Sequence, residues 1–255
     1  MAKKRLGIIQ TRGLGDIIIA LPIARHYHDQ GWEIYWPIQD DFVASVKNHV
    51  PWVKWIPIAR DPGAFFYDTP LERLQNFKCD EVLPLYQSLS THPEFAARPE
   101  FQIMKFDQYK YSVAGVPFLK KWQLADCVTR DRVAEQELYD RLVTPGRSYA
   151  VVHLDGSDHR AEFDTQMIPP EWDTIEIKDG LTPSIFNWLK ILESAESIIC
   201  VDSVVANLVD QMGIGDDRYF IVRSHIHLTP VLGHAWTVLE PAPAVANKIR
   251  IFGSG

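Results

Sequence analysis

Residues 5–29 read RLGIIQTRGLGDIIIALPIARHYHD, and this stretch decides the fold. Arg5 to Gln10 is a short apolar run of the β type, and apolar residues recur at helical spacing from Asp16 to Asp29. Two glycines lie in the turn between these segments, and Gly31 ends the helix, as expected of a residue that tolerates positive φ. A strand, a glycine turn and a helix in this order predict the first unit of a parallel α/β sheet.

The alternation of strands and helices continues beyond this unit. Further elements of the first half are predicted as strands at 32–38, 53–59 and 81–86 and helices at 41–49 and 133–142. Residues 87–130 are less periodic, and we expect long loops and short helices there. Thr144-Pro145-Gly146 then breaks the chain, which predicts domains over 1–145 and 146–255.

A second alternation begins at Tyr149. Its predicted elements are strands at 149–154, 174–177, 197–201, 218–222 and 236–239 and helices at 183–195 and 204–212. We therefore expect an α/β fold with two halves, each built on a parallel sheet.

Composition excludes several classes of protein. Hydrophobic residues make up 46% and charged residues 23% of the 255, which is ordinary globular usage and excludes a disordered chain. The net charge of −7 argues against a broadly basic nucleic-acid surface. The apolar runs are too short to span a bilayer, and no secretory segment opens the chain, so we expect a soluble, cytoplasmic protein. The three cysteines form no CxxC pair, so no zinc site is expected from them. We do not expect a zinc site at the His225/His227 pair either.

The turn Gly13-Leu14-Gly15-Asp16 is the first candidate site. Glycines let backbone amides approach a ligand, but Asp16 would repel a phosphate there, and neither GxGxxG nor a P-loop is present. A carboxylate after the first strand suits a base that takes a proton from an acceptor hydroxyl. The alternative is that Asp16 only caps the helix.

Two further candidates lie in the second half. Asp202-Ser203 precedes the helix at 204–212, whose first amides could hold a pyrophosphate; an ordinary helix cap is the alternative. The loop Asp155-Gly156-Ser157-Asp158-His159-Arg160 follows a strand, and its cationic side chains could neutralise phosphate; a polar strand-to-loop junction is the alternative.

Taken in order, these segments resemble glycosyltransferase family nine, the ADP-heptose:lipopolysaccharide heptosyltransferase group. The resemblance rests on two blocks, GLGDIIIALP at 13–22 and the block from Leu181 to Ser203 that ends in ESAESIICVDS. It implies the GT-B architecture, in which two Rossmann-like domains face each other across a cleft. It also implies an inverting, metal-independent transfer with no cofactor, in which the nucleotide-sugar donor is a co-substrate.

The resemblance also assigns site residues. The family's proposed base maps onto Asp16, and we expect the acceptor at the N-terminal domain, beside Arg12, Gly13, Leu14 and Gly15. The segment that meets the donor phosphates maps onto Asp202, Ser203 and Val204. The other expected donor-binding residues are Gly156, Ser157, Arg160 and Asn207.

The chain departs from the family pattern at the donor site. Val204 replaces a glycine, Asn207 replaces a histidine, and Arg160 is only a positional counterpart of the family's lysine. A helix expected between residues 160 and 173 is also trimmed. These departures favour the alternative of an inactive protein that binds a nucleotide or nucleotide sugar without turnover.

The acceptor is left open by the sequence. A lipopolysaccharide-type saccharide suits the family, and DNA that carries a hydroxylated base is the alternative. The second rests on one basic-aromatic stretch, with Lys105, Lys110, Lys120 and Lys121 among Phe106, Tyr109, Tyr111 and Trp122. A loop whose aromatic rings are tucked into the core is the competing interpretation of that stretch.

Overall fold

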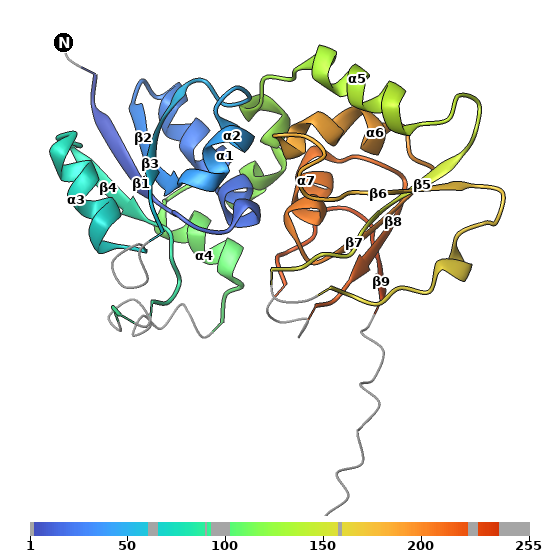
Figure 1. The fold of residues 1–255 in the computed structure, drawn as a ribbon. Helices are drawn as coiled ribbons and strands as arrows, with labels where there is room; N and C mark the ends of the chain where they lie inside the picture. The colour runs from blue at the N-terminus through green and yellow to red at the C-terminus, as the bar shows by residue number, and fades with distance from the viewer. Residues whose placement is uncertain are drawn as a thin grey trace, which may run out of the picture.

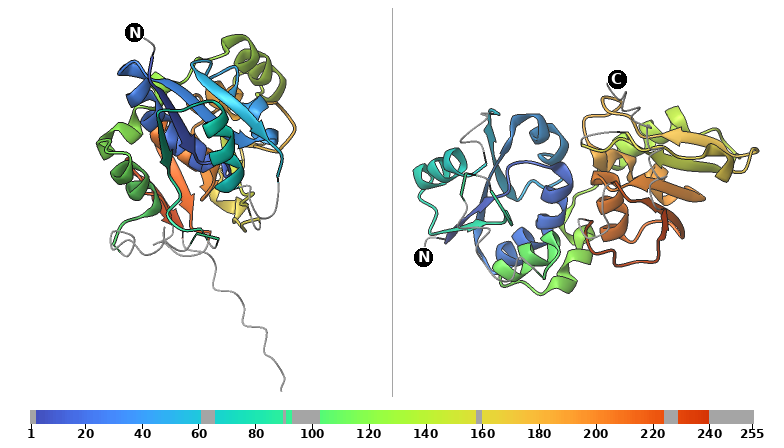
Figure 2. Two further views of the ribbon diagram at one scale, coloured as in Figure 1. Left: turned by 90° about the vertical axis from the view of Figure 1, so that its left-hand side faces the viewer. Right: turned by 90° about the horizontal axis from the view of Figure 1, so that it is seen from below.

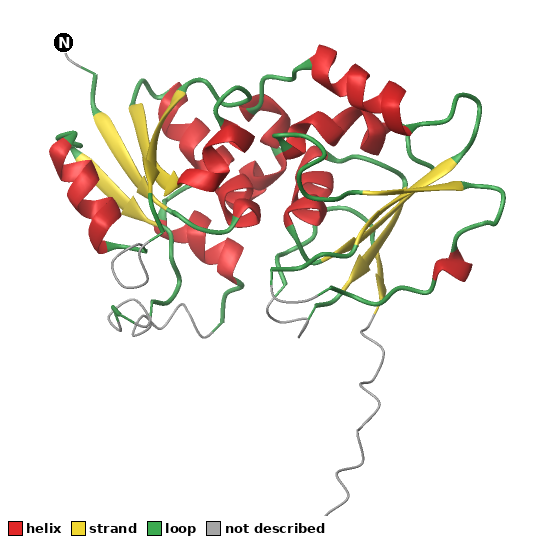
Figure 3. Cartoon of the chain, in the orientation of Figure 1, coloured by secondary structure: helices red, strands yellow, loops and turns green. Residues whose placement is uncertain are grey.

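The chain forms two parallel β-sheets, one in each half, with helices between and around them (Figure 1). This computed structural model describes residues 3–60, 66–89, 91–92, 103–157, 160–223 and 229–239. Figure 3 shows that helices fill the space between the two sheets.

The first sheet has the order β3-β2-β1-β4, and every pair in it is parallel. Its strands are β1 (Arg5–Ile9), β2 (Glu33–Gln39), β3 (Val53–Ile58) and β4 (Glu81–Pro84). The helices of this half are α1 (Leu14–Asp29), α2 (Asp40–Val46), α3 (Asp68–Asn76), α4 (Phe106–Val113) and the 3₁₀ turns η3 (Phe118–Trp122) and η4 (Leu124–Cys127). Helix α5 (Arg132–Leu142) leads into the second half.

The second sheet has the order β6-β5-β7-β8-β9 and is also parallel throughout. Its strands are β5 (Tyr149–His153), β6 (Asp173–Glu176), β7 (Ser197–Val201), β8 (Asp217–Ile221) and β9 (Thr237–Leu239). Its helical elements are η5 (Thr165–Met167), η6 (Ile185–Trp188), α6 (Leu189–Glu193) and α7 (Val204–Met212).

The two halves share one apolar core. Helix α1 packs against α7, and a single buried cluster runs from Leu6 and Ile18 in the first half to Leu208 and Phe220 in the second. The view from below in Figure 2 shows the two sheets on either side of these helices. The predicted α/β class, with a parallel sheet in each half, is confirmed.

Helix α5 lies against η6 and α6 of the second half (Figure 1). Arg130, just before α5, pairs with Glu193 at the end of α6, which ties the connecting segment to that half. The boundary between 145 and 146 stays a prediction.

Two predicted features differ from the structure. The helix expected at 183–195 is a 3₁₀ turn followed by a five-residue α-helix, because the Ser184 hydroxyl accepts the Phe186 amide hydrogen and starts the turn there. Helix α3 was not predicted, since its nine residues are mostly polar and only Pro70 and Leu74 are buried.

Candidate active site at the junction of the two sheets

The strand orders define where a ligand is expected to bind. In open parallel sheets, ligands bind beyond the carboxyl ends of the strands, where the strand order reverses. That point lies between β1 and β4 in the first sheet and between β5 and β7 in the second. The predicted residues Asp16 and Ser203 follow β1 and β7, so each belongs to one of these points.

Tyr86, which follows β4, is hydrogen-bonded to the segment that follows β1 at the switch point of the first sheet. Its hydroxyl oxygen accepts hydrogen bonds from the backbone amides of Thr11 at 2.9 Å and Arg12 at 3.2 Å, and lies 2.8 Å from the Thr11 hydroxyl. Burial raises the pKa of Tyr86 to about 12, so the phenol keeps its proton. The segment that leads from β1 into the glycine turn is therefore held in one conformation, and it carries the exposed Arg12 next to Phe66.

Gly13 is required by both the backbone and the Asp16 side chain. Its φ is +78°, and a Cβ at this position would lie 2.6 Å from Oδ2 of Asp16. Gly13 occupies the N-cap position of α1, where no side chain caps the helix. The interpretation of Asp16 as the helix cap is therefore wrong, because its carboxylate turns back over Gly13 from the first turn.

Lys110 holds the other oxygen of Asp16. Its ammonium group is 3.1 Å from Asp16 Oδ1, and it donates to Gln10 Oε1 at 2.6 Å and to the carbonyl oxygen of Leu85 at 3.2 Å. The residue is only 3% exposed, whereas the Asp16 side chain is 37% exposed. A buried cation therefore fixes a carboxylate whose second oxygen lies toward the glycine turn.

The basic-aromatic stretch does not form an exposed cationic surface. Lys110 and Lys121 are buried, and Lys121 pairs with Asp107 at 2.7 Å. Tyr109 and Tyr111 are buried as well, with 3% and 1% of their surfaces exposed. The competing interpretation is confirmed for the rings of Tyr109 and Tyr111, but the stretch forms α4 and η3 and is not the loop that this interpretation expected.

The side chains of His153, at the end of β5, and Ser203, after β7, lie side by side at the switch point of the second sheet. The Ser203 hydroxyl is 2.9 Å from Nδ1 of His153, and burial lowers the pKa of that histidine. Ser203 stands at the N-cap position of α7, but its side chain does not cap the helix. The capping interpretation is therefore wrong for this side chain too, and within the described residues no side chain is recorded as capping the first amides of α7.

Asp202 carries an unusual proton affinity. Burial raises its pKa to about 6; Arg223 and Lys105 act in the opposite direction, and Asp16 adds to the increase. The carboxyl group is thus half protonated near pH 6. At that pH its ionised fraction is smaller than that of an ordinary aspartate.

The N-termini of α1 and α7 meet at Gly15. A Cβ on Gly15 would lie 3.3 Å from Nδ2 of Asn207 and 3.4 Å from Cα of Val204. Two positive helix ends at one place favour negative charge beside them. The Asn207 amide group itself turns inward and donates to the Ser203 carbonyl oxygen at 2.9 Å.

The predicted loop after β5 is engaged in other contacts. Arg160 pairs with Asp155 at 2.9 Å and with Glu176. Ser157 accepts a hydrogen bond from Arg223, and Gly156 is half-buried beside it. Asp158 and His159 lie outside the described residues, as do His225 and His227.

Sequence reasoning missed four side chains of this site. Tyr86, His153 and Arg223 each stand at or just after the end of a predicted strand, so the topological rule would have pointed to them. Lys110 gave no such signal, because its partner Asp16 is far away in the sequence. Its role depends on the packing of α4 against the first sheet.

Two searches of the described part of the chain are negative. No group of three or more His, Cys, Asp or Glu side chains is placed there to hold a metal ion. Within the same ranges, none of the helices combines the length and the apolar character needed to cross a membrane.

The fold is that of two-domain glycosyltransferases. It is similar to E. coli heptosyltransferase WaaC with ADP, with a TM-score of 0.53 at 15% sequence identity over 94% of this chain and 93% of that one. A glycosyl transferase family 9 structure from Veillonella parvula gives a TM-score of 0.59 at 14% identity, over 93% of this chain and 86% of that one.

A third structure, E. coli ADP-heptose lps heptosyltransferase II, has a TM-score of 0.59 at 12% sequence identity, over 92% of this chain and 90% of that one. No family model and no curated protein matches the sequence. At these identities the likeness concerns the fold, and it agrees with the resemblance that the two sequence blocks indicated.

Proposed function

We propose that the chain is a glycosyltransferase that moves a sugar from a nucleoside diphosphate sugar to an acceptor hydroxyl. One observation carries the proposal: the switch points of both sheets adjoin, with a carboxylate on the α1 side and uncapped helix amides on the α7 side. A base and an anion-binding helix end at one junction suit a single displacement at an anomeric carbon.

The proposed reaction uses residues of both halves. The acceptor hydroxyl gives its proton to Asp16 while its oxygen forms a bond to the anomeric carbon from the side opposite the leaving group. The bond from that carbon to the diphosphate breaks, and its electron pair leaves with the diphosphate. Attack from the opposite side inverts the anomeric configuration.

The leaving diphosphate is expected beside α7. The amides of Val204 and the next residues, the Ser203 hydroxyl and the Arg223 guanidinium would stabilise its charge. Lys110 holds Asp16 by Oδ1, so Oδ2 is the oxygen that we assign to proton transfer. No metal is given a role, and metal independence stays a prediction.

The acceptor is proposed to be a saccharide hydroxyl. Arg12 is exposed beside the glycine turn, and it is the cationic side chain that we expect to meet the acceptor. DNA with a hydroxylated base stays an untested alternative, without the support of the basic-aromatic stretch.

A second candidate function is nucleotide binding without turnover. Val204 stands where the family pattern has glycine, Asn207 is turned inward, and Arg160 is held by two carboxylates. With these differences, we expect the donor phosphates to be bound less tightly than the family pattern implies.

A panel of ADP-, UDP-, GDP- and CMP-sugars, with ADP-heptose first, tests the proposal by thermal shift. A ligand at 100 times its dissociation constant adds about 2.7 kcal/mol to the free energy of unfolding. We expect at least one sugar nucleotide to raise the melting temperature and to release nucleoside diphosphate. A shift without release would favour the second function, and a flat panel would contradict both.

A further inference from the structure

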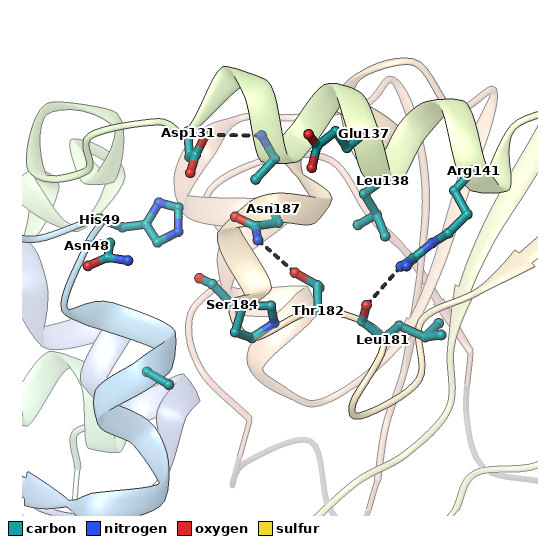
Figure 4. Close-up of a pocket in the computed structure, with 13 residues that line it drawn as sticks. Asn48, His49, Asp131, Glu137, Leu138, Arg141, Leu181, Thr182, Ser184 and Asn187 are labelled. Carbon is teal, nitrogen blue, oxygen red and sulfur yellow. Dashed lines mark hydrogen bonds between the residues drawn. The ribbon is translucent and has the colours of Figure 1, made fainter.

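A pocket of about 290 Å³ lies between the two halves and outside the candidate active site (Figure 4). His49, just after α2, belongs to its wall from the first half, and Asn187 of η6 belongs to its wall from the second. Leu138 of α5 also lines it. Its volume lies at the lower end of the range for small-molecule pockets, which starts at about 300 Å³, so only a ligand of few atoms would fit.

Asn187, one of the residues that line this pocket, has an unsatisfied side-chain acceptor that is itself buried. The residue is 5% exposed, and its Nδ2 donates to the Thr182 hydroxyl oxygen at 2.7 Å. Its buried Oδ1 has no hydrogen-bond partner among the described residues. In Figure 4 the nitrogen points to Thr182 and the oxygen to the side of His49. Buried carbonyl oxygens are normally paired, so this atom calls for a donor.

Thr182 and His49 add matching groups. Because Thr182 Oγ1 accepts from Asn187, its own hydrogen is directed to another acceptor. His49 Nδ1 lies 3.0 Å from the carbonyl oxygen of Thr129, so this nitrogen donates. The other ring nitrogen is then an acceptor in the neutral ring, and no described residue donates to it. The inner wall therefore offers two acceptors and one donor.

The rim of the pocket disfavours an anion. Asp131 and Glu137 line it with two carboxylates, and Arg141 is the one cation among its lining residues. One guanidinium nitrogen of Arg141 is already bound to the carbonyl oxygen of Leu181 at 2.8 Å. A phosphate would meet net negative charge here, unlike at the helix ends of the active site.

We propose that this pocket binds a neutral polyhydroxylated molecule of about monosaccharide size. Neighbouring hydroxyl groups both donate and accept, which is what Asn187 Oδ1, the His49 ring and the Thr182 hydroxyl require together. Leu138 and Pro183 supply apolar contacts for the carbon skeleton. The ligand would touch both halves at once, and the proposal is independent of glycosyl transfer at Asp16.

The test uses amide NMR spectra of the full chain with three kinds of probe. D-mannose, D-galactose and myo-inositol represent the neutral class, putrescine an amine, and inorganic phosphate an anion. We expect a neutral probe to shift the amides of Asn187 and Leu138, with little effect from the other two. The proposal is overturned if no neutral probe shifts these amides, or if only putrescine or phosphate does.

Two variants and a matched control locate the binding. Asn187→Leu removes the acceptor at similar volume, and Ala44→Phe fills the pocket from an exposed position. Each is expected to weaken binding at least about tenfold, since a buried hydrogen bond or the space itself is lost. Asn76→Leu, at the exposed end of α3, should bind as the wild type does. Unchanged affinity in Ala44→Phe, whose exposed site tolerates the change, would place the probe elsewhere and overturn the assignment.

Discussion

Gly13 is the residue on which the position of the proposed base depends. A residue with a side chain at this position would have to adopt a φ of +78°. Its Cβ would also lie 2.6 Å from Oδ2 of Asp16, which is a steric clash. Gly31 has a φ of +90°, but nothing lies within 4 Å of its missing Cβ. The pair separates the backbone requirement from the effect on the carboxylate.

We therefore expect Gly13→Ala to lower nucleoside diphosphate release far more than Gly31→Ala does. Both changes should cost about 1–3 kcal/mol of unfolding free energy, because both place alanine at positive φ. Only the first displaces the Asp16 carboxylate. Urea unfolding and a donor-turnover assay on the two variants check this, and equal turnover in both would remove Gly13 from the account.

Lys110 offers a second prediction at this scale. Lys110→Met keeps the apolar stem but removes the group that holds Asp16 and Gln10, so we expect slower turnover and a loss of about 1–3 kcal/mol of stability. Nucleotide affinity should change little, since Lys110 is on the acceptor side. Lys47→Met, at an exposed lysine, is the control. A variant that loses nucleotide binding but keeps its turnover rate would contradict this role.

Among the elements, the N-terminus of α7 follows a carboxyl group whose charge changes near pH 6. Asp202 precedes it, and burial raises the pKa of this carboxyl from 3.8 to about 6. Between these values the folded chain holds a proton that the unfolded chain has lost. The free energy of unfolding therefore falls as the pH rises through this window, by up to about 3 kcal/mol.

The same titration should affect the nucleotide. We expect ADP affinity to fall between about pH 5 and about pH 7, because the ionised Asp202 then repels the phosphates. Asp202→Asn should flatten both the affinity and the stability profiles, and its comparison with the wild type removes the titration of ADP itself. Calorimetric titration at about pH 5 and about pH 7, and urea unfolding at about pH 4 and about pH 6, measure these slopes; identical slopes in the variant would contradict the assignment.

The elements show how far the sequence alone could lead. Local sequence patterns indicate the buried strands and the glycine turn at 13–15, so the α/β class and the order of the strands and helices could be predicted. The pairing of Lys110 with Asp16 could not, since it depends on how α4 packs. The structure brings Asp16 and Ser203 to adjoining helix ends, as the resemblance implied, while their roles stay predictions.

At the scale of the whole molecule, Asp210 ties the halves together. It is 1% exposed and accepts from Trp122 at 2.8 Å, from the Gly233 amide at 3.0 Å and from Trp236 at 3.0 Å. Trp122 belongs to η3 in the first half, and Asp210 to α7 in the second. Its carboxylate therefore joins both halves to the segment that precedes β9.

We expect Asp210→Ala to destabilise the whole chain by more than about 3 kcal/mol, because it removes three hydrogen bonds to a buried charged group, each of which contributes about 1.5–3 kcal/mol. Asp216→Ala, at an exposed position nearby, should change stability by less than about 0.5 kcal/mol. Urea unfolding followed by tryptophan fluorescence measures both. A loss in Asp210→Ala no larger than in the control would show that the halves are held without this residue.

The most direct measurement is nucleoside diphosphate release from the sugar nucleotide that binds best, compared between the wild type and Asp16→Asn. Asp29→Asn, an exposed carboxylate at the other end of α1, is the matched control. We predict that Asp16→Asn lowers the rate by about 10²–10⁴-fold at nearly unchanged nucleotide affinity, while the control stays active. Undiminished release from Asp16→Asn would contradict the assignment of this carboxylate as the base.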